Sequence, residues 1–503
     1  MKSFTKKLLS VALALSVMVG GSFAFTMMTP ASQAITTDNT WNGNAPKYIF
    51  LFIGDGMSYP QFTSANDYLG AVATEGKKVE SKNLGFTEFP VTGSAMTFDS
   101  TSFCPDSAST ATSISTGHKT LSGVINMDEQ KTVAYETIAE KLKKQFGYKI
   151  GVVSSVPINH ATPAAFYAHQ PSRSNYYDIA KELVNSDFNY FGGGGFLQQQ
   201  GKDGKQKDIL DLATEKGYKI ANTKDDILKL TSANDKVIAI NPELIDGAMP
   251  YEIDRKNGEL SLADFTRKGI DTLYNETGFF MMVEGGKIDW ACHANDAMAS
   301  IKDTVAFNDA VQEAVKFYEK YPDETLIIVT GDHETGGLTI GFAGTKYSTY
   351  LDQLSKQTVS YESYDEKVAD FRNSKTSFEI ALNDIYKNFG LMAANNPNAT
   401  SNSNMVLSDY EYGKLKAAYE MSMLPSADRN LTEEEELLYG GYEPLSVTIT
   451  HLLNNKSGIG WTSYSHTGIP VAVFATGKGS TLFGGYYDNT DIFVKLKALT
   501  NVK

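Results

Sequence analysis

Three apolar segments of this chain each end in an acidic residue, and this shared placement indicates a metal site. Residues 47–54 lead into Asp55, residues 279–283 into Glu284, and residues 325–331 into Asp332. Segments of this length, rich in β-branched and aromatic residues, are typical of buried parallel strands. Such strands place their carboxyl ends along one edge of an open α/β sheet, where ligands bind. Carboxylates gathered there repel one another unless cations neutralise them, so the sequence predicts bound metal ions.

Two pairs of side chains near these acids have the spacing and chemistry of metal ligands. Asp289 and His293 are four residues apart in a helical pattern, so they share one face of the helix. A carboxylate and an imidazole suit Zn²⁺, which binds nitrogen and oxygen donors in a roughly tetrahedral shell. Asp332 is followed directly by His333, and a nearby pair of glycines lets the backbone turn tightly around them. Glu334, which comes next, is left open as a supporting residue or a surface residue.

Ser107 is the candidate nucleophile. It follows Pro105 and Asp106, which suit the first turn of a helix that ends near Gly117. The positive end of the helix dipole favours an ionised serine oxygen and a bound phosphate at this position. A serine hydroxyl is a poor nucleophile at neutral pH unless a base or a metal lowers its pKa. On its own, the segment also fits an ordinary capped helix of small residues.

A further set of candidate residues follows the predicted strand at residues 149–154. His160 and Thr162 are suited to bind another cation or its waters, and Arg173 offers a planar fork of donors for an oxyanion. Taken singly, Thr162 also fits a helix cap and Arg173 a surface ion pair. These residues gain weight only when all the motifs are considered together.

The motifs, in their order along the chain, resemble the alkaline phosphatase family. They are Asp55-Gly-Met-Ser, Asp106-Ser107-Ala, His160-Ala-Thr162-Pro-Ala-Ala, His169-x-x-x-Arg173, Glu284-Gly-Gly-x-Ile-Asp289-x-x-x-His293, Gly-Asp332-His333-x-Thr-Gly-Gly and Ser465-His466-Thr-Gly. The resemblance runs from about residue 46 to about residue 500. It implies an exported phosphomonoesterase that converts small phosphate monoesters to an alcohol and inorganic phosphate through a phosphoserine intermediate.

The resemblance also implies a role for each candidate residue. Ser107 is expected to be the phosphorylated nucleophile, and Arg173 is expected to hold the phosphate. Two Zn²⁺ and one Mg²⁺ are expected in each subunit. The first zinc site would comprise Asp289, His293 and His466, the second Asp55, Asp332 and His333, and the magnesium site Asp55, Thr162 and Glu284.

Two positions depart from the compact enterobacterial-type pattern of the family. His160 stands where that pattern has an acid, two residues before Thr162. Trp290 stands where it has a lysine, directly after Asp289, and is expected near the substrate. The identity of the metal in the third site is therefore left open, with His160 as a candidate ligand.

Three other functions fit the sequence less well. A phosphodiesterase of the same superfamily is expected to have a threonine nucleophile and no arginine clamp, unlike Ser107 and Arg173. A non-catalytic phosphate-binding surface protein is expected to have lost at least one ligand, and none is missing from the sequence. A sulfatase is suggested only superficially by Cys104-Pro105, because its motif requires a nearby arginine that this chain lacks.

The composition and the first residues of the chain indicate an exported globular protein. Of its 503 residues, 42% are hydrophobic and 21% charged. Residues 1–34 combine three lysines, an apolar run and small residues, which predicts a signal peptide cleaved after Ala34 or after Ala24. The mature protein is expected to be periplasmic or secreted, without stable membrane insertion.

Charge and cysteine content add two further expectations. The signal segment holds three lysines and no acid, so its loss takes the formal net charge from -14 to -17, and no nucleic-acid partner is expected. The two cysteines, Cys104 and Cys292, allow one disulfide, and both the bonded and the free state stay open.

Alternating patterns predict a three-layer α/β sandwich with a mostly parallel central sheet. Beyond the strands that end in acids, strands are expected at residues 149–154, 236–240 and 471–474, and helices at residues 132–146 and 291–321. The catalytic domain is expected to cover residues 35–503.

Residues of about 345–445 are expected to form a peripheral, crown-like insertion in this domain. Helical patterns at residues 361–372, 377–388 and 408–423 have apolar faces that are too small to bury themselves alone. They are expected to pack on the main domain or on a second subunit of a homodimer. The alternative is a separate C-terminal domain, which would leave His466 remote from the acids.

Overall fold

The structure, a computed structural model, describes Gly43 and residues 45–503. The expected signal peptide, residues 1–34, lies outside the described residues. Within the described part of the chain, no helix is both long enough and apolar enough to cross a membrane.

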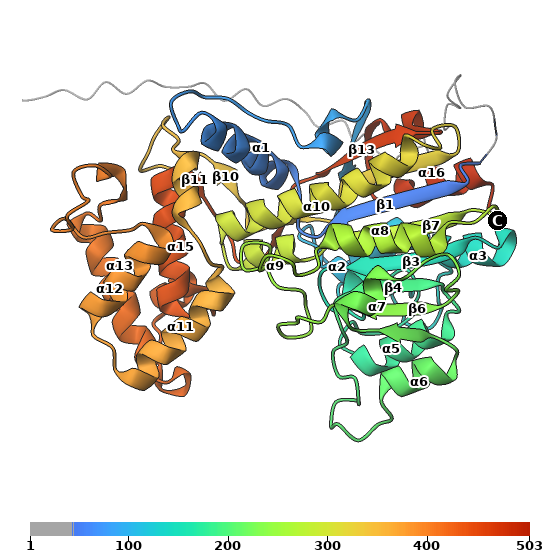
Figure 1. The fold of residues 1–503 in the computed structure, drawn as a ribbon, viewed down its shortest axis with the longest axis horizontal. Helices are drawn as coiled ribbons and strands as arrows, with labels where there is room; N and C mark the ends of the chain where they lie inside the picture. The colour runs from blue at the N-terminus through green and yellow to red at the C-terminus, as the bar shows by residue number, and fades with distance from the viewer. Residues whose placement is uncertain (1–42, 44) are drawn as a thin grey trace, which may run out of the picture. The chain divides into compact units, whose positions relative to one another are not determined.

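A ten-stranded sheet forms the centre of the fold (Figure 1). In spatial order its strands are β14 (Gly485–Asp488), β2 (Val91–Met96), β13 (Val471–Gly477), β8 (Thr325–Gly331), β1 (Tyr48–Gly54), β7 (Phe279–Gly285), β3 (Lys149–Ser154), β4 (Tyr190–Gly193), β6 (Val237–Ile240) and β5 (Lys219–Ala221). β13 is antiparallel to both of its neighbours, and every other neighbouring pair is parallel. The predicted mostly parallel sheet is confirmed.

The central strands are apolar throughout because both faces of the sheet are covered. In β1, Tyr48, Phe50 and Phe52 belong to one buried cluster, whereas the alternate residues Ile49 and Leu51 belong to another. Successive side chains of a strand point to opposite faces, so this division places a separate core on each side. Continuous apolar runs are the pattern expected of strands buried on both faces.

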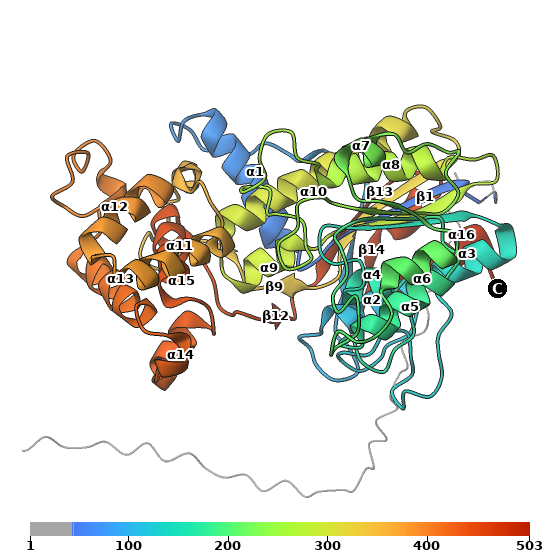
Figure 2. The same cartoon turned by 60° about the horizontal axis from the view of Figure 1, so that its bottom comes forward.

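Helices supply both cores and complete three layers (Figure 2). The first cluster includes residues of α1 (Tyr59–Ala73), α7 (Lys224–Leu228), α8 (Leu262–Leu273) and α10 (Ala297–Tyr318). The second includes residues of α2 (Ser107–Thr116), α3 (Ile138–Phe146), α4 (Ala161–Ala164), α5 (Tyr176–Asn185), α6 (Ile209–Glu215) and α16 (Thr490–Thr500). In Figure 2, α8 and α10 lie above the strands and α5 and α6 below them.

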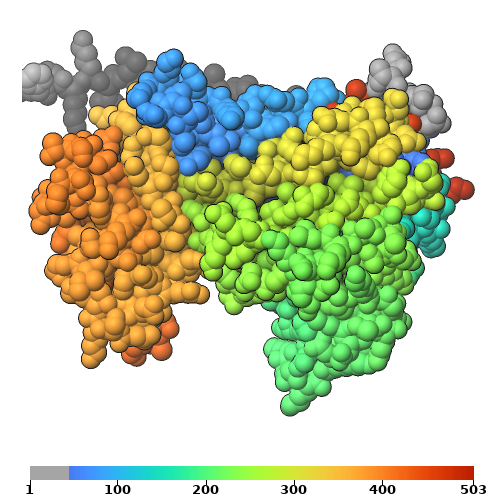
Figure 3. Space-filling view, viewed as in Figure 1, coloured from blue at the N-terminus to red at the C-terminus, as the bar shows by residue number. Residues whose placement is uncertain are grey.

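The segment expected as an insertion is helical. It contains α11 (Tyr361–Ser374), α12 (Phe378–Phe389), α13 (Asp409–Ser422) and α14 (Glu433–Tyr439), and α15 (Pro444–Ser457) follows. A short antiparallel pair, β10 (Thr339–Ile340) with β11 (Ile459–Gly460), joins the two ends of this segment. Figure 3 shows the orange part of the chain, which belongs to this segment, in contact with the yellow-green part, in whose residue range α9 (Lys287–His293) falls. Residues of α11, α12, α13 and α15 share the buried cluster of α1 and α10.

Two helix boundaries differ from those expected. The pattern at residues 132–146 predicted one helix, but α3 begins only at Ile138, because Thr137 and Glu140 form a capping box there. Thr132 and Val133 instead donate their backbone N–H groups to the Asp128 carboxylate. The pattern at residues 291–321 corresponds to two helices, of which α9 begins earlier, at Lys287.

Gly331 provides a test of how closely the chain packs beside the acids. A Cβ atom at this residue would lie 1.9 Å from the backbone oxygen of Met57. We expect Gly331→Ala to lower the free energy of unfolding by about 1–3 kcal/mol, as overpacking does. Urea unfolding measures this change. Gly413→Ala is the matched control, because a Cβ there meets nothing within 4 Å and α13 gains a better helix former. Equal stability of the two variants would contradict the close packing at Gly331.

Candidate active site

The three central strands end at the same level, which brings their acids together. Gly54 of β1 is in register with Gly285 of β7 and with Gly331 of β8. Asp55 and Asp332 are the next residues after β1 and β8, and Glu284 is the penultimate residue of β7. All three side chains are buried, with exposed fractions of 1% or less. The sheet therefore concentrates negative charge at one edge, away from water.

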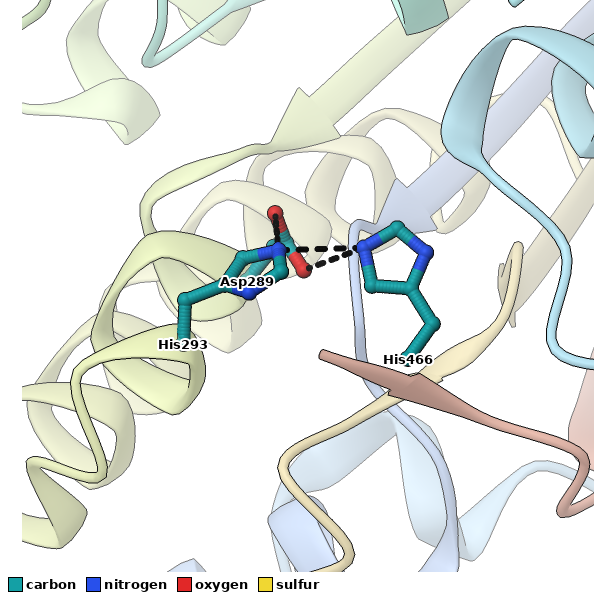
Figure 4. Close-up of side chains that lie close together, drawn as sticks. All are labelled: Asp289, His293 and His466. Atoms are coloured by element: carbon teal, nitrogen blue, oxygen red, sulfur yellow. Dashed lines mark hydrogen bonds and ion pairs between the residues drawn. The ribbon is translucent and has the colours of Figure 1, made fainter. Parts of the chain in front are cut away.

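Asp289, His293 and His466 form the first group of ligand atoms (Figure 4). His293 Nε2 lies 3.4 Å from Asp289 Oδ2, and His466 Nε2 lies 3.6 Å from Asp289 Oδ1. The two Nε2 atoms are 3.0 Å apart. Asp289 and His293 share α9, whereas His466 comes from β12 (His466–Thr467), far along the chain.

Backbone carbonyls fix the orientation of both imidazoles. The Nδ1 atom of His293 donates to the carbonyl of Tyr464, and that of His466 donates to the carbonyl of Pro105, each at 2.6 Å. Because a carbonyl oxygen only accepts, Nδ1 carries a proton in both rings, which leaves Nε2 of each as the atom available to a cation. Such anchoring is typical of metal-bound histidines. Burial lowers the pKa of His293, but Asp289 raises it to about 9, so in the absence of a cation the Nε2 atom of His293 also carries a proton.

Asp55, Asp332 and His333 form the second group. His333 Nε2 lies 3.3 Å from Asp55 Oδ1 and 3.3 Å from Asp332 Oδ2. Burial, reinforced by Asp289, raises the pKa of Asp332 to about 8, and burial with Asp332 raises that of Asp55 well above its usual range. Burial lowers the pKa of His333 well below its usual value, so its imidazole is neutral. Two carboxylates and a neutral imidazole fit Zn²⁺.

Glu284 and Thr162 lie on the other side of Asp55. Thr162 Oγ1 donates to Asp55 Oδ2 at 3.3 Å, and Ser154 Oγ donates to Glu284 Oε2. Glu284 Oε1 is buried and has no hydrogen-bond partner among the described residues. Burial raises the pKa of Glu284 to about 7. A buried carboxylate oxygen without a donor is the kind of atom that a cation satisfies, and an all-oxygen set suits Mg²⁺.

Ser107 is the first residue of α2 and lies against the second group. Its Oγ is 3.1 Å from His333 Nε2 and 3.5 Å from Asp55 Oδ1. The residue before it, Asp106, caps the helix by accepting from the backbone N–H of Ser109 at 3.1 Å. The side chain is 2% exposed. The expected placement at a helix N-terminus puts the hydroxyl beside the candidate ligands.

Arg173 lies next to Ser107 because Asp106 holds it there. Its Nη1 donates to Asp106 Oδ2 at 2.9 Å, and Asp106 Oδ1 accepts from the backbone N–H of Gly123 at 2.9 Å. Burial raises the pKa of Asp106, but Arg173 and these N–H groups hold it below its usual value, so the pair stays charged. Arg173 Nη2 is 3.5 Å from His160 Nε2. Burial, with Arg173, lowers the pKa of His160 to about 3 and keeps it neutral.

Comparison with known proteins decides the family. The alkaline phosphatase family model matches residues 46–502. The chain belongs to the alkaline phosphatase family. Alkaline phosphatase 3 of Bacillus subtilis is 30% identical over 505 residues, which cover 98% of this chain and 96% of the relative.

Solved structures agree with this assignment. A cold-active alkaline phosphatase from a psychrophilic Shewanella is 27% identical with a TM-score of 0.73, covering 90% of this chain and 99% of that one. The alkaline phosphatase of the Antarctic bacterium TAB5 is 26% identical with a TM-score of 0.61, covering 92% and 99%. A variant of the TAB5 enzyme, with a TM-score of 0.60, is described with Mg bound in its M3 site. The protein is an enzyme of the alkaline phosphatase kind.

Two further residues support the candidate ligands: Thr335, to which the sequence gave no role, and Glu334, which it left open as a supporting or a surface residue. Thr335 Oγ1 donates to Asp289 Oδ1 at 2.5 Å and lies 3.3 Å from His333 Nδ1, so it connects the two ligand groups. Glu334 is buried, and it accepts from Gln61 Nε2 at 2.8 Å and from Thr467 Oγ1. Glu334 is therefore a supporting residue rather than a surface residue. The only sequence signal for either was a position between Asp332-His333 and the glycine pair.

The remaining sequence-based expectations concern Trp290 and the cysteines. The Trp290 ring packs edge-on against His160, with centroids 5.9 Å apart and planes at 77°. His160 thus contacts both Trp290 and Arg173. Cys104 is exposed and Cys292 is buried, and both are free thiols in the structure.

Removal of metal from the protein should destabilise it more at alkaline pH. The metal-free fold keeps protons on Glu284 and Asp332 up to about pH 7 and about pH 8, whereas the unfolded chain releases them at roughly pH 4. Metal-free stability therefore falls as the pH rises through this range, while metal binding strengthens as its ligands deprotonate. We expect the difference in Tm between metal-loaded and chelator-treated protein to grow from about pH 7 to about pH 8.5.

Differential scanning fluorimetry at the two pH values measures this difference. Glu284→Gln is the matched control, because it removes one of the titrating carboxyls without changing the side-chain volume. The metal-free Glu284→Gln protein should lose less Tm between the two pH values than metal-free wild type. A difference in Tm that is the same at both pH values in wild type would refute the role of the buried carboxylates.

Proposed function

We propose that the protein is an exported, metal-dependent phosphomonoesterase that acts through a phosphoserine intermediate on Ser107. The observation that carries this proposal is the position of Ser107 Oγ, 3.1 Å from His333 Nε2 and next to the Arg173–Asp106 pair. The candidate nucleophile thus lies against one group of candidate metal ligands, and the residue before it holds the candidate oxyanion donor. Membership of the alkaline phosphatase family supports the same activity.

The ligand groups define where the metals would be held. Zn²⁺ would occupy the group of Asp289, His293 and His466 and the group of Asp55, Asp332 and His333, and Mg²⁺ would be held by Asp55, Thr162 and Glu284, with His160 nearby. When bound, these cations supply positive charge that lowers the pKa of a serine hydroxyl or a water and stabilises developing oxyanions.

Different residues then bind the phosphate and form the new bond to phosphorus. Arg173, held by Asp106, orients the phosphate and stabilises its equatorial oxygens. Ser107 Oγ loses its proton and forms a bond to phosphorus as the bond to the alcohol oxygen breaks, and the alcohol leaves with a proton. Water then attacks the phosphoserine, which releases inorganic phosphate and returns the proton to Ser107.

Two rival functions have less support. A phosphodiesterase of the same superfamily would be expected to lack the arginine clamp, whereas Arg173 pairs here with Asp106, the residue before Ser107. A non-catalytic phosphate-binding protein would be expected to lack part of the ligand set, whereas every expected ligand is buried or half-buried at the site. We further propose that the enzyme acts outside the cytoplasm and forms a homodimer, with residues of about 345–445 as the insertion that contributes to the dimer.

Ser107→Ala tests the nucleophile. We expect turnover of an aryl phosphate to fall by roughly 10³-fold or more, because the variant lacks the attacking oxygen. Bound zinc, measured by mass spectrometry, should be retained, since the ligand groups are intact. Ser113→Ala in the same helix is the control, because Ser113 Oγ donates only to the backbone oxygen of Ser109. Near-normal turnover by Ser107→Ala would reject the proposed nucleophile.

Arg173→Ala tests the phosphate clamp. We expect the inhibition constant of inorganic phosphate and the KM of an aryl phosphate to rise by about tenfold or more, because a charge-assisted pair of hydrogen bonds is lost. Arg267→Ala is the control, since Arg267 pairs with Asp264 on the partly exposed face of α8. Unchanged inhibition by phosphate in Arg173→Ala would remove Arg173 from the site.

A further inference from the structure

Lys287 is a buried cation at the first turn of the helix that carries Asp289 and His293. Its side chain has an exposed fraction of 0%. An ammonium group without water must be compensated by a partner of opposite charge or by other polar contacts. The residues that compensate this charge are therefore the parts of the chain that Lys287 holds together.

The partners of Lys287 come from two parts of the chain. Its Nζ donates to Glu362 Oε2 at 3.1 Å, and Glu362 belongs to α11, the first α-helix of the segment expected as an insertion. The same Nζ lies 3.6 Å from the ring centroid of Tyr251 and 4.9 Å from that of Trp290. Contacts of this kind between a cation and ring faces are stronger when water is excluded. Lys287 thus fixes the Trp290 ring and joins it to α11, which lies beside α9 in Figures 1 and 2.

Trp290 extends this set of contacts to the proposed phosphate clamp. Its ring packs edge-on against His160 at 5.9 Å, and His160 Nε2 lies 3.5 Å from Arg173 Nη2. The guanidinium has its other contact, at Nη1, with Asp106. His160 and Asp106 thus hold the two ends of the guanidinium fork, so the position of His160 affects the direction in which Arg173 points.

We propose that the Lys287–Glu362 ion pair is a positioning device for phosphate binding, through which the α11 segment sets the orientation of Trp290, His160 and Arg173. Lys287 and Glu362 do not touch the phosphate themselves. The proposal rests on the proposed function, because it takes Arg173 as the residue that binds phosphate. It assigns to the helical segment an effect on substrate affinity that is separate from any role in assembly.

Glu362→Gln and Lys287→Met, studied in the full-length metal-loaded enzyme, test this proposal. Each variant keeps nearly the same volume and removes one charge of the pair. We expect the inhibition constant of inorganic phosphate and the KM of an aryl phosphate to rise by about three- to tenfold, with kcat within about twofold, because a small displacement of Arg173 weakens phosphate contacts. The double variant should bind phosphate no more weakly than the single variant that has the lower affinity, since both substitutions break the same interaction.

Tyr361→Phe is the matched control. It removes a hydroxyl of α11 that accepts from Tyr251 OH at 3.3 Å, which is another contact between α11 and the main domain. It leaves both rings and the Lys287–Glu362 pair in place. Its phosphate inhibition constant should stay within about twofold of wild type. An equal loss of phosphate affinity in Tyr361→Phe would overturn the proposal, because any weakening of the contacts between α11 and the main domain would then have the same effect.

Zinc content and phosphate affinity separate the remaining outcomes. A loss of bound zinc in Glu362→Gln with a matching fall in kcat would overturn the proposal, since the pair would then hold the α9 ligands. If Arg173→Ala weakens phosphate binding and folded Glu362→Gln and Lys287→Met do not, this inference alone fails. If the wild-type enzyme neither binds inorganic phosphate nor hydrolyses the aryl phosphate, the proposed function fails together with it.

Discussion

The repulsion between buried carboxylates is the interaction on which the arrangement of this molecule depends. Three strands end in register, so Asp55, Glu284 and Asp332 are forced together where water cannot screen them. Burial, reinforced by this repulsion, raises the pKa of Asp55 well above its usual range and that of Asp332 to about 8. Bound cations would therefore stabilise this edge of the sheet. The same charge that makes the metal-free edge unfavourable makes it selective for divalent ions over neutral ligands.

The supporting contacts solve a second problem, which is to hold flexible side chains in one orientation. The carbonyls of Pro105 and Tyr464 set the imidazoles of His466 and His293, and Thr335 ties one ligand group to the other. Pro105 lies two residues before Ser107, so the segment that carries the nucleophile also orients a ligand of the first group. Nucleophile and candidate ligands are thereby held as one connected unit rather than as independent parts.

The sequence predicted the long central strands and pointed to the acids at their ends because both produce local patterns, whereas the full candidate ligand set, with Thr162 and His466, came from the resemblance to the alkaline phosphatase family. Residues 47–54 are a continuous apolar run, and each acid comes directly after or at the end of such a run. Short strands such as β4 and β5 gave no comparable pattern, and at α3 an amphipathic pattern continued past the capping box at Thr137. Glu334 and Lys287 were beyond local patterns for a different reason. Their burial depends on Gln61 and Glu362, which are 273 and 75 residues away in the chain.

The small ladder between β10 and β11 has a consequence for how this chain can change in length. Its two strands tie residues 339–340 to residues 459–460, so the base of the helical segment is closed before the chain reaches His466. Closing a longer or shorter loop at such a base changes the entropy only with the logarithm of loop length. Chain entropy therefore sets little limit on the length of the segment beyond the ladder, because the ladder returns the chain to the same point in either case. What limits a change of length there is packing rather than chain closure, because helices of the segment share their buried cluster with α1 and α10.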